Sequence, residues 1–259
     1  MKHILSLSIC ILACAAATRG HAADDLTVIS NVTTNGKPDG IETNYISNDH
    51  IRTSHAGSTD MIINLKTGVM TNIDNKKKTY YEVTKQDMET MQAKMVEKMN
   101  DPKMKQAMAM MQGMGQSMAG STEVKKTGVS RKVAGFACEE WSISMAQMMT
   151  ITECVTSDLK YPVQSWAALA EFNESMRKSM SGFGPTAKSG ADFAEKMKSI
   201  RGFPVASSST VDAGVVKMTN SSEVTEVRHT AIPDSTWEVP AGFAKVENPM
   251  VRALQEHGR

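Results

Sequence analysis

Short hydrophobic segments that alternate with polar residues fill the chain between residues 26 and 83. These segments are rich in β-branched or aromatic residues, a composition typical of strands. They cover residues 26–30, 41–46, 51–54, 61–65, 69–73 and 79–83. Turn signals built from Gly, Asn, Asp and Pro separate them and leave no room for crossover helices. The pattern therefore predicts a meander of antiparallel strands.

The spacing of the hydrophobic positions changes after the last of these strands. Thr84 and Asp87 have the spacing of a capping box, which predicts that a helix begins here. The hydrophobic residues that follow at helical spacing are methionines, namely Met88, Met91, Met95 and Met99. Asn100-Asp101-Pro102 predicts a bend into a second methionine-rich helix. We therefore expect a helical insertion over residues 85–118.

Strand-like alternation returns at residue 123 and continues to about residue 155. After Tyr161-Pro162, a helical pattern predicts a second insertion over residues 163–200. Further strands are expected at residues 205–210, 215–219 and 223–230, followed by a proline-containing extended segment over residues 232–243. No linker separates domains. The pattern thus predicts one α+β domain over residues 23–249, an antiparallel sheet with two helical insertions, and a tail over residues 250–259.

The first residues have the pattern of an export signal. Lys2 and His3 precede an apolar run that is too short to span a bilayer comfortably, and Gly20 and Ala22 have the small side chains of a cleavage site. We expect residues 1–22 to be removed and the soluble remainder to reside in the periplasm. Alternatively, the run before Cys14 loosely resembles a lipobox, which would make the protein a lipoprotein anchored at Cys14 in the outer membrane.

The two remaining cysteines, Cys138 and Cys154, predict a disulfide in an oxidising compartment. Alternation on both sides of a short turn predicts a hairpin with Cys138 opposite Cys154. Trp141 would then face Ile151, and Ile143 would face Met149. In the second strand, Met149, Ile151 and Glu153 alternate with Thr150 and Thr152. Because the spacing is not CxxC and no His lies nearby, we interpret the pair as structural.

Composition and charge restrict the class of function. The chain has 29 Lys and Arg against 28 Asp and Glu, which argues against a broad basic surface for nucleic acid or anionic lipid. Asp49 with His50, and His55 with Asp60, are the acid–imidazole pairs, but no Ser or Cys nucleophile motif stands beside them. We therefore expect no enzymatic activity and no cofactor.

The methionines are the strongest compositional anomaly, because ten of them lie between Met88 and Met118. They allow three interpretations: a helix face that packs on the sheet, a pliable groove for an apolar ligand, or a Cu(I) or Ag(I) site. The groove would use Met88, Met91, Met95, Met108 and Met111. The metal site would use Met108, Met111 and Met114.

Several motifs together resemble an exported bacterial family known as domain of unknown function 4412. They are His50-Ile-Arg52, Ile62-Ile-Asn-Leu-Lys-Thr-Gly68, Ile73-Asp74, Lys78-Thr-Tyr80-Tyr81, Val133-Ala-Gly135-Phe-Ala-Cys138, Cys154-Val155, Arg201-Gly-Phe-Pro204, Ile232-Pro-Asp-Ser and Val239-Pro-Ala-Gly242-Phe243. Families of this kind are similar to the LolA/LolB-type periplasmic lipoprotein carriers. That resemblance implies a half-barrel, a curved antiparallel sheet wrapped around helices, which binds an apolar ligand.

The sequence therefore predicts a non-enzymatic periplasmic binding protein for a lipid, an acyl chain or an apolar peptide. A methionine-rich metal-binding protein and an envelope protein that docks a partner are the alternatives. We expect no nucleic-acid partner, and membrane association only through a lipidated Cys14.

Overall fold

A computed structural model describes residues 25–55, 57–100, 122–145, 149–162, 170–171, 174, 195–212 and 217–256. The described residues form one twelve-stranded sheet in the order β12-β6-β5-β4-β3-β2-β1-β11-β10-β9-β8-β7. The strands are β1 (Leu26–Thr34), β2 (Lys37–Ile46), β3 (His50–His55), β4 (Thr59–Asn64), β5 (Val69–Asp74), β6 (Thr79–Val83), β7 (Thr122–Val133), β8 (Phe136–Met145), β9 (Met149–Thr156), β10 (Phe203–Asp212), β11 (Lys217–Arg228) and β12 (Ala244–Lys245).

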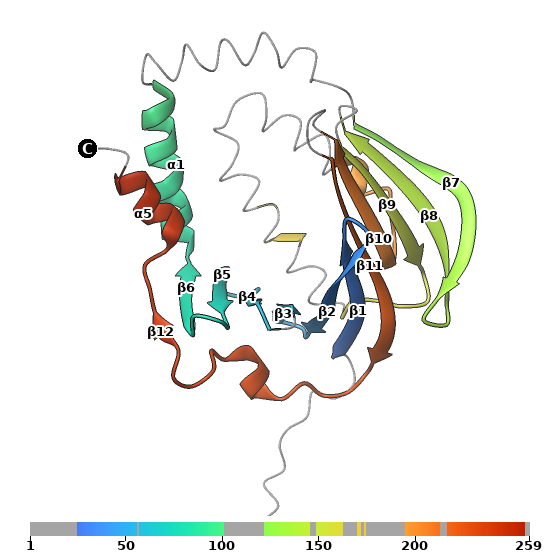
Figure 1. The fold of residues 1–259 in the computed structure, drawn as a ribbon, viewed down its shortest axis with the longest axis horizontal. Helices are drawn as coiled ribbons and strands as arrows, with labels where there is room; N and C mark the ends of the chain where they lie inside the picture. The colour runs from blue at the N-terminus through green and yellow to red at the C-terminus, as the bar shows by residue number, and fades with distance from the viewer. Residues whose placement is uncertain are drawn as a thin grey trace, which may run out of the picture.

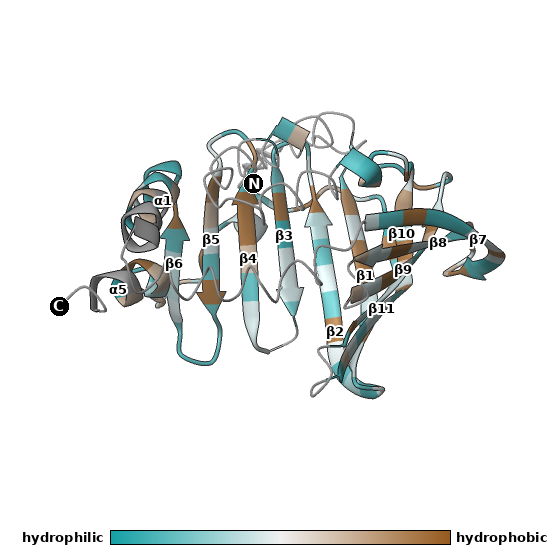
Figure 2. Cartoon of the chain, turned by 90° about the horizontal axis from the view of Figure 1, so that it is seen from above, coloured by the Kyte–Doolittle hydropathy of each residue, from teal (hydrophilic) through white to brown (hydrophobic). Residues whose placement is uncertain are grey.

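The sheet is curved and unclosed, with β7 and β12 at its two edges. Strands β1–β6 form one meander and β7–β11 form a second, and the pairing of β1 with β11 joins them. Figure 1 shows β2–β6 as a floor and β7–β11 as a wall that rises from it. Figure 2 shows the same floor from its inner side, with the strands running side by side. This shape agrees with the expected half-barrel curvature.

The first meander confirms the six predicted strands, although most are longer than their hydrophobic segments. The β1–β2 hairpin illustrates the reason, because its ladder extends to Thr34 opposite Lys37 through polar residues. Asn35 and Gly36 form the connection with φ angles of 52° and 74°, the left-handed conformation that a tight hairpin turn requires. Backbone pairing therefore continues beyond the residues that contribute to the core.

The predicted capping box is confirmed at the start of α1 (Lys85–Asn100). The Thr84 backbone N–H donates to Asp87 Oδ2 at 2.8 Å, and the Asp87 N–H donates back to Thr84 Oγ1 at 3.1 Å. Two donors that a helix start leaves without partners are thereby satisfied. The first insertion is helical through α1, and residues 101–118 lie outside the described part.

The second insertion falls mostly outside the described residues. Of its span, residues 170–171, 174 and 195–200 are described, and residues 170–171, 174 and 195–197 are helical. A helix over the whole of residues 163–200 therefore stays a prediction.

The prediction of two separate strands at residues 215–219 and 223–230 is wrong. A single strand, β11, runs from Lys217 to Arg228 without a break, and Asn220 to Ser222 pair with β1 on one side and β10 on the other. The small polar residues in this segment suggest a turn when the sequence is considered alone. Ladder hydrogen bonds from two neighbouring strands override that local preference.

The buried core lies where the two meanders meet. Leu26 and Val205 are fully buried, and Val28, Ile46, Phe203 and Val224 pack with them. These residues come from β1, β2, β10 and β11, so the hydrophobic effect holds together strands that are distant in sequence.

The predicted disulfide is present, but the predicted hairpin register is wrong by two residues. Cys138 and Cys154 are bonded with a Cα–Cα distance of 5.3 Å. Cys154 lies opposite Glu140, and Ile143 lies opposite Ile151, because the ladder extends to Met145 opposite Met149. A shift of two residues keeps every side chain on its predicted face. The apolar face is therefore as expected although the partners differ.

The C-terminal segment crosses the outer side of the floor and then joins its far edge. We call residues 229–243 the strap; it contains the short 3₁₀ helix η2 (Asp234–Trp237), and Figure 1 shows it below β2–β6. Strand β12 then pairs in parallel with β6. Residues 249–256, assigned mainly to a tail, form helix α5 (Pro249–Glu256), which contacts α1. Within the described ranges, no helix is both long and apolar enough to cross a membrane.

Candidate functional site

A cavity of about 450 Å³ opens on the inner side of the curved sheet. Its walls come from β1, β2 and β3 on one side and from β9, β10 and β11 on the other, with Tyr161 beside them. The apolar lining residues include Val28, Val32, Ile46, Ile51, Phe203, Val205 and Val224. The polar lining residues include Ser30, Glu42, Asn44, Glu153, Ser207, Ser209, Asn220 and Ser222.

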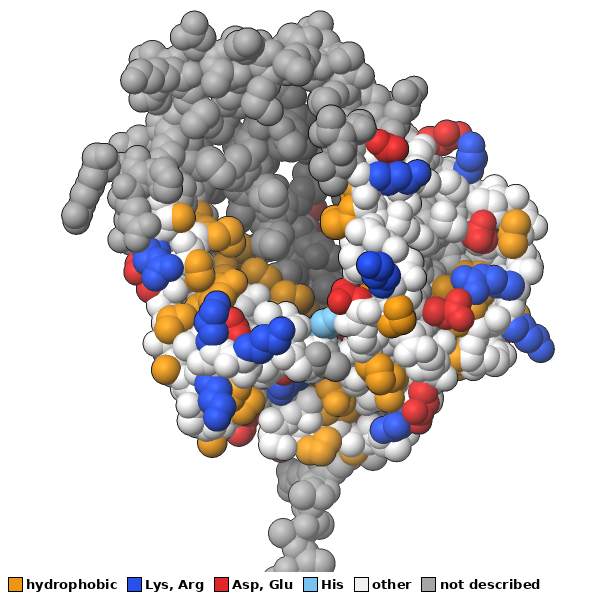
Figure 3. All heavy atoms as spheres, viewed as in Figure 1, with side chains coloured by type: hydrophobic (Ala, Val, Ile, Leu, Met, Phe, Trp, Pro, Cys, Tyr) orange, Lys and Arg blue, Asp and Glu red, His pale blue; other side chains and the backbone are white. Residues whose placement is uncertain are grey.

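On this inner surface, apolar residues of neighbouring strands pair with one another in one row, and polar residues pair with one another on the opposite wall. The apolar row contains directly paired residues from β2 to β6, namely Ile46, Ile51, Ile63, Met70 and Val83. Figure 3 shows hydrophobic side chains gathered over the inner side of β4–β6 and towards α1. On the opposite wall, Ser207 lies between Glu153 and Ser222. An apolar surface therefore leads into a cavity whose far wall carries hydroxyl and carboxylate groups.

The two carboxylates of the lining occupy opposite walls. Asn44 Nδ2 donates a hydrogen bond to Glu42 Oε1 at 2.9 Å, and Thr53 Oγ1 donates to Asn44 Oδ1 at 2.7 Å. These contacts hold Glu42 on the β2 wall. Glu153 lies on β9, half-buried, and burial raises the pKa of its carboxyl. Burial has this effect because it disfavours the charged form of an acid.

Tyr161 and Phe203 form the apolar margin near Glu153. Their ring centroids are 4.7 Å apart and the rings are tilted by 36°, an arrangement that aromatic pairs favour. Burial, with a smaller contribution from the Glu153 carboxylate, raises the pKa of Tyr161 to about 12. The hydroxyl therefore stays protonated and neutral at physiological pH.

The methionines that the sequence analysis proposes as a groove lie elsewhere or outside the described side chains. Met88 and Met91 are half-buried on α1 and do not line the cavity. The side chain of Met95 and residues Met108, Met111 and Met114 are not described. The groove and metal roles of these methionines stay predictions. Within the described ranges, no group of His, Cys, Asp or Glu is placed to hold a metal ion.

A second polar cluster lies on the outer side of β3 and β4, beneath the strap. Arg52 pairs with Asp60, and their side chains are 13% and 5% exposed. Asp60 Oδ1 also accepts hydrogen bonds from Ser54 Oγ at 2.8 Å and Asn75 Nδ2 at 3.0 Å. Arg52 Nη1 donates to the Thr236 carbonyl of the strap at 2.7 Å. We call Arg52, Ser54, Asp60 and Asn75 the Arg52–Asp60 cluster.

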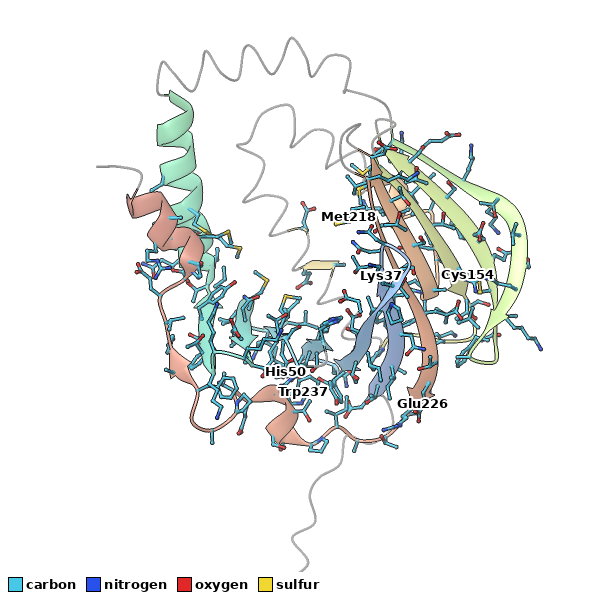
Figure 4. The ribbon with its side chains drawn as sticks, viewed as in Figure 1. Lys37, His50, Cys154, Met218, Glu226 and Trp237 are labelled. Carbon is cyan, nitrogen blue, oxygen red and sulfur yellow. A yellow bond between two sulfur atoms is a disulfide. The ribbon has the colours of Figure 1, made fainter. Side chains whose placement is uncertain are left out.

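One of the two acid–imidazole pairs forms. His50 Nδ1 lies 2.8 Å from Asp49 Oδ1. The His50 ring stacks on the Trp237 ring of the strap, with the ring centroids 5.3 Å apart (Figure 4). Partial burial acts to raise the pKa of Asp49, but hydrogen bonds from Lys66 and His50 prevail and lower it to about 2. The stacking of His50 on Trp237 links the strap to β3.

His55 and Asp60 do not pair, because neighbouring residues of a strand alternate between the two faces of the sheet. Asp60 lies opposite Ser54 on the outer side. His55 Nε2 instead lies 3.2 Å from the Asp39 carbonyl oxygen. Ser54 bonds to Asp60, whereas His50 bonds to Asp49.

Sequence reasoning missed the cavity residues, although one signal was available. Glu153 falls in phase with Met149 and Ile151, so it lies on the apolar face of its strand. A charged residue at such a position is unusual and indicates either a buried partner or a ligand. The serines at 207, 209 and 222 gave no comparable signal, because isolated serines in strands are common.

Comparison with known proteins identifies a family and distantly similar solved structures, two of which are those of PNGF-II and MucB. The family model described as Domain of unknown function (DUF4412) matches residues 29–243. Among curated proteins nothing matches. A solved structure of PNGF-II is similar with a TM-score of 0.40 and 11% identity over 92% of this chain and 34% of that chain. The crystal structure of MucB is similar with a TM-score of 0.36 and 8% identity over 86% of this chain and 60% of that chain.

The chain thus spans about a third of PNGF-II and three fifths of MucB. Similarities this low do not bear on function, so the proposals below depend on the geometry of the chain itself.

Proposed function

We propose that this chain, which belongs to the DUF4412 family of domains of unknown function, is a binding protein for an apolar or amphipathic small molecule. The proposal rests on the geometry of the chain itself. The ligand occupies the inner cavity between β1–β3 and β9–β11. The observation that carries the proposal is this cavity of about 450 Å³ with an apolar row leading into it.

The size and lining of the cavity support this proposal. Small-molecule sites commonly occupy roughly 300–1,000 Å³ and combine an apolar wall with a few polar groups that fix orientation. Here Val28, Phe203 and Val205 provide apolar surface, and Glu42 and Ser207 provide polar groups. An acyl chain could lie along the row from Ile46 to Val83, with a polar head between the two walls.

The proposal places this binding in the periplasm and assigns the protein no catalytic step. The pattern of residues 1–22 and the Cys138–Cys154 disulfide both suit an exported protein. Asp49 and His50 pair on the outer side, where the His50 ring stacks on Trp237 of the strap, whereas Glu153 faces the cavity. A protein that holds an apolar molecule in an aqueous compartment would act as a carrier or a sensor.

The test blocks the cavity with one bulky side chain and uses its neighbour as the control. Ser207→Trp fills the inner side of β10, whereas Ser208→Trp places the same group on the opposite face of the same strand. Binding is measured with a neutral apolar fluorophore, N-phenyl-1-naphthylamine, and by native mass spectrometry of co-purified lipid. We expect Ser207→Trp to weaken binding at least about tenfold and Ser208→Trp to leave it unchanged.

Circular dichroism and urea unfolding establish that both variants are folded before binding is compared. Absence of fluorophore binding and of co-purified lipid in the wild-type protein would overturn the proposal. Equal loss of binding in both folded variants would also contradict it, because the site would then lie elsewhere.

A further inference from the structure

We infer that the ligand of the inner cavity carries a positively charged amine beside its apolar part. This inference rests on the proposed binding function and adds the chemical class of the head group. The observation behind it is that the described lining residues include two glutamates and neither Lys nor Arg. Carboxylates on the two walls of an otherwise neutral cavity attract a cation and repel an anion.

The two carboxylates line the same cavity from different strands. Glu42 lies on β2 and Glu153 on β9, and the curvature of the sheet turns these strands towards the same cavity. Lys37 lies at the hairpin end of β2 and does not line the cavity. The two acidic residues are therefore not neutralised by a basic residue within the described lining.

Glu153 is the stronger determinant, because it lies at an apolar position of β9. In the described part of the chain it accepts no hydrogen bond from another side chain, unlike Glu42, which Asn44 contacts. The burial that raises its pKa indicates that an ionised Glu153 is poorly solvated. A bound ammonium group restores the lost solvation through a charge-assisted hydrogen bond.

The hydroxyl groups nearby suit the same head group. Ser207 lies opposite Glu153, and Ser222 lies opposite Ser207 on the next strand. Their oxygens can accept further hydrogen bonds from an ammonium group, which has only donors. Two carboxylates with several hydroxyls therefore form a set of acceptors, which favours a donor-only head such as a primary amine.

The test compares three ligands with the same twelve-carbon chain and different heads. Dodecylamine, dodecanol and dodecanoate are titrated into the wild-type protein at pH 7, and binding is measured by isothermal calorimetry. The amine and the carboxylate are kept below their critical micelle concentrations, and the alcohol is kept below its solubility limit. We expect dodecylamine to bind about tenfold more tightly than dodecanol, and dodecanoate to bind most weakly. Binding of dodecanoate that equals or exceeds that of dodecylamine would overturn the inference.

Variants locate the preference. In Glu153→Gln, and further in Glu42→Gln/Glu153→Gln, we expect the ratio of dodecylamine to dodecanol affinity to fall towards one, while dodecanol affinity changes little. Glu226→Gln is the matched control, because Glu226 lies on the outer side of the sheet beside Arg228 (Figure 4). Glu42→Gln alone provides a second test if the double variant does not fold. A ratio that is unchanged in all the folded variants of the lining would contradict the inference.

Dodecanol separates the two proposals. If dodecanol binds without any preference for the amine, the binding function stands and the head-group assignment fails. If none of the three ligands binds, the cavity function itself fails.

Discussion

Acidic side chains on the outer and inner faces of the sheet differ in their partners. On the outer side, Asp60 is bound by Arg52, Ser54 and Asn75, and the strap covers the group. On the inner side, Glu153 faces a cavity without a basic partner among the described lining residues. Removing one partner of a buried ion pair destabilises the fold, whereas an acid without a counter-charge is a group that a ligand can pair with.

The outer and inner carboxylates differ in how many hydrogen-bond partners the protein itself provides. The Arg52–Asp60 cluster joins β3 and β4 to the strap through the Thr236 carbonyl, so its charged groups have partners within the protein. On the inner side, Asn44 donates to one oxygen of Glu42, and no described side chain donates to Glu153. The comparison teaches that buried charge alone does not identify a site, since its hydrogen-bond partners decide its role.

The largest expected effect comes from breaking the outer cluster. Asp60→Ala removes the partner of a buried Arg52 and should lower the free energy of unfolding by about 4 kcal/mol, because an uncompensated buried charge remains. Urea unfolding measures the loss. Glu139→Ala, which removes the partner of the exposed Lys126, is the control and should cost far less. A small loss of unfolding free energy in Asp60→Ala would show that the Arg52–Asp60 cluster does not stabilise the fold in this way.

The disulfide gives the next largest effect and tests the inner wall. Cys138→Ser/Cys154→Ser opens a covalent link between residues 16 positions apart, which should lower the free energy of unfolding by about 3 kcal/mol in the chain-entropy model. Because Cys154 is adjacent to Glu153, we also expect weaker binding at the cavity. Reduction of the wild-type protein with dithiothreitol should reproduce the loss, and an unchanged unfolding midpoint after complete reduction would refute this role.

The smallest effect is the pH dependence contributed by Glu153. Its pKa in the folded protein lies above the ordinary value of 4.5, so the folded state binds this proton more tightly than the unfolded chain. Ionisation of Glu153 therefore lowers the stability of the fold as the pH rises above about 4.5, and the loss levels off once the carboxyl is ionised in the folded state. Glu153→Gln removes this penalty.

We accordingly expect Glu153→Gln without ligand to be more stable than the wild type at pH 7, and the gain to disappear near pH 4. Unfolding in urea at both pH values measures the difference, with Glu226→Gln as the control. A variant that is less stable than the wild type at pH 7 would indicate that Glu153 has a stabilising partner and would weaken the comparison between the two faces.

Local sequence signals predicted much of the fold. The first six strands, the Thr84–Asp87 capping box and the Cys138–Cys154 bond all follow from alternation, residue type and spacing. The membership in DUF4412 follows from short motifs in a fixed order. Each of these features depends on interactions between residues near one another in the chain, or on a covalent pair with no competing partner.

The candidate site was much harder to predict. The sequence drew attention to methionines on the helices, whereas the cavity is lined by serines, valines and two glutamates from six strands. Glu42 and Glu153 are 111 positions apart in sequence (153 minus 42), and no local pattern connects them. Only the pairing of β1 with β11 brings their walls around one cavity.

By itself, the sequence determined which residues alternate into strands, where α1 begins and which face of each strand is apolar. Tertiary structure decided the two-residue difference in the β8–β9 register, the merging of β11 into one strand, the strap over β3 and the placement of Glu42 and Glu153 in the lining of one cavity. The physical reason is that alternation fixes the face of a side chain, because its period is two residues. Which strands become neighbours depends on long-range ladder hydrogen bonds and on burial of apolar surface, which are properties of the folded chain.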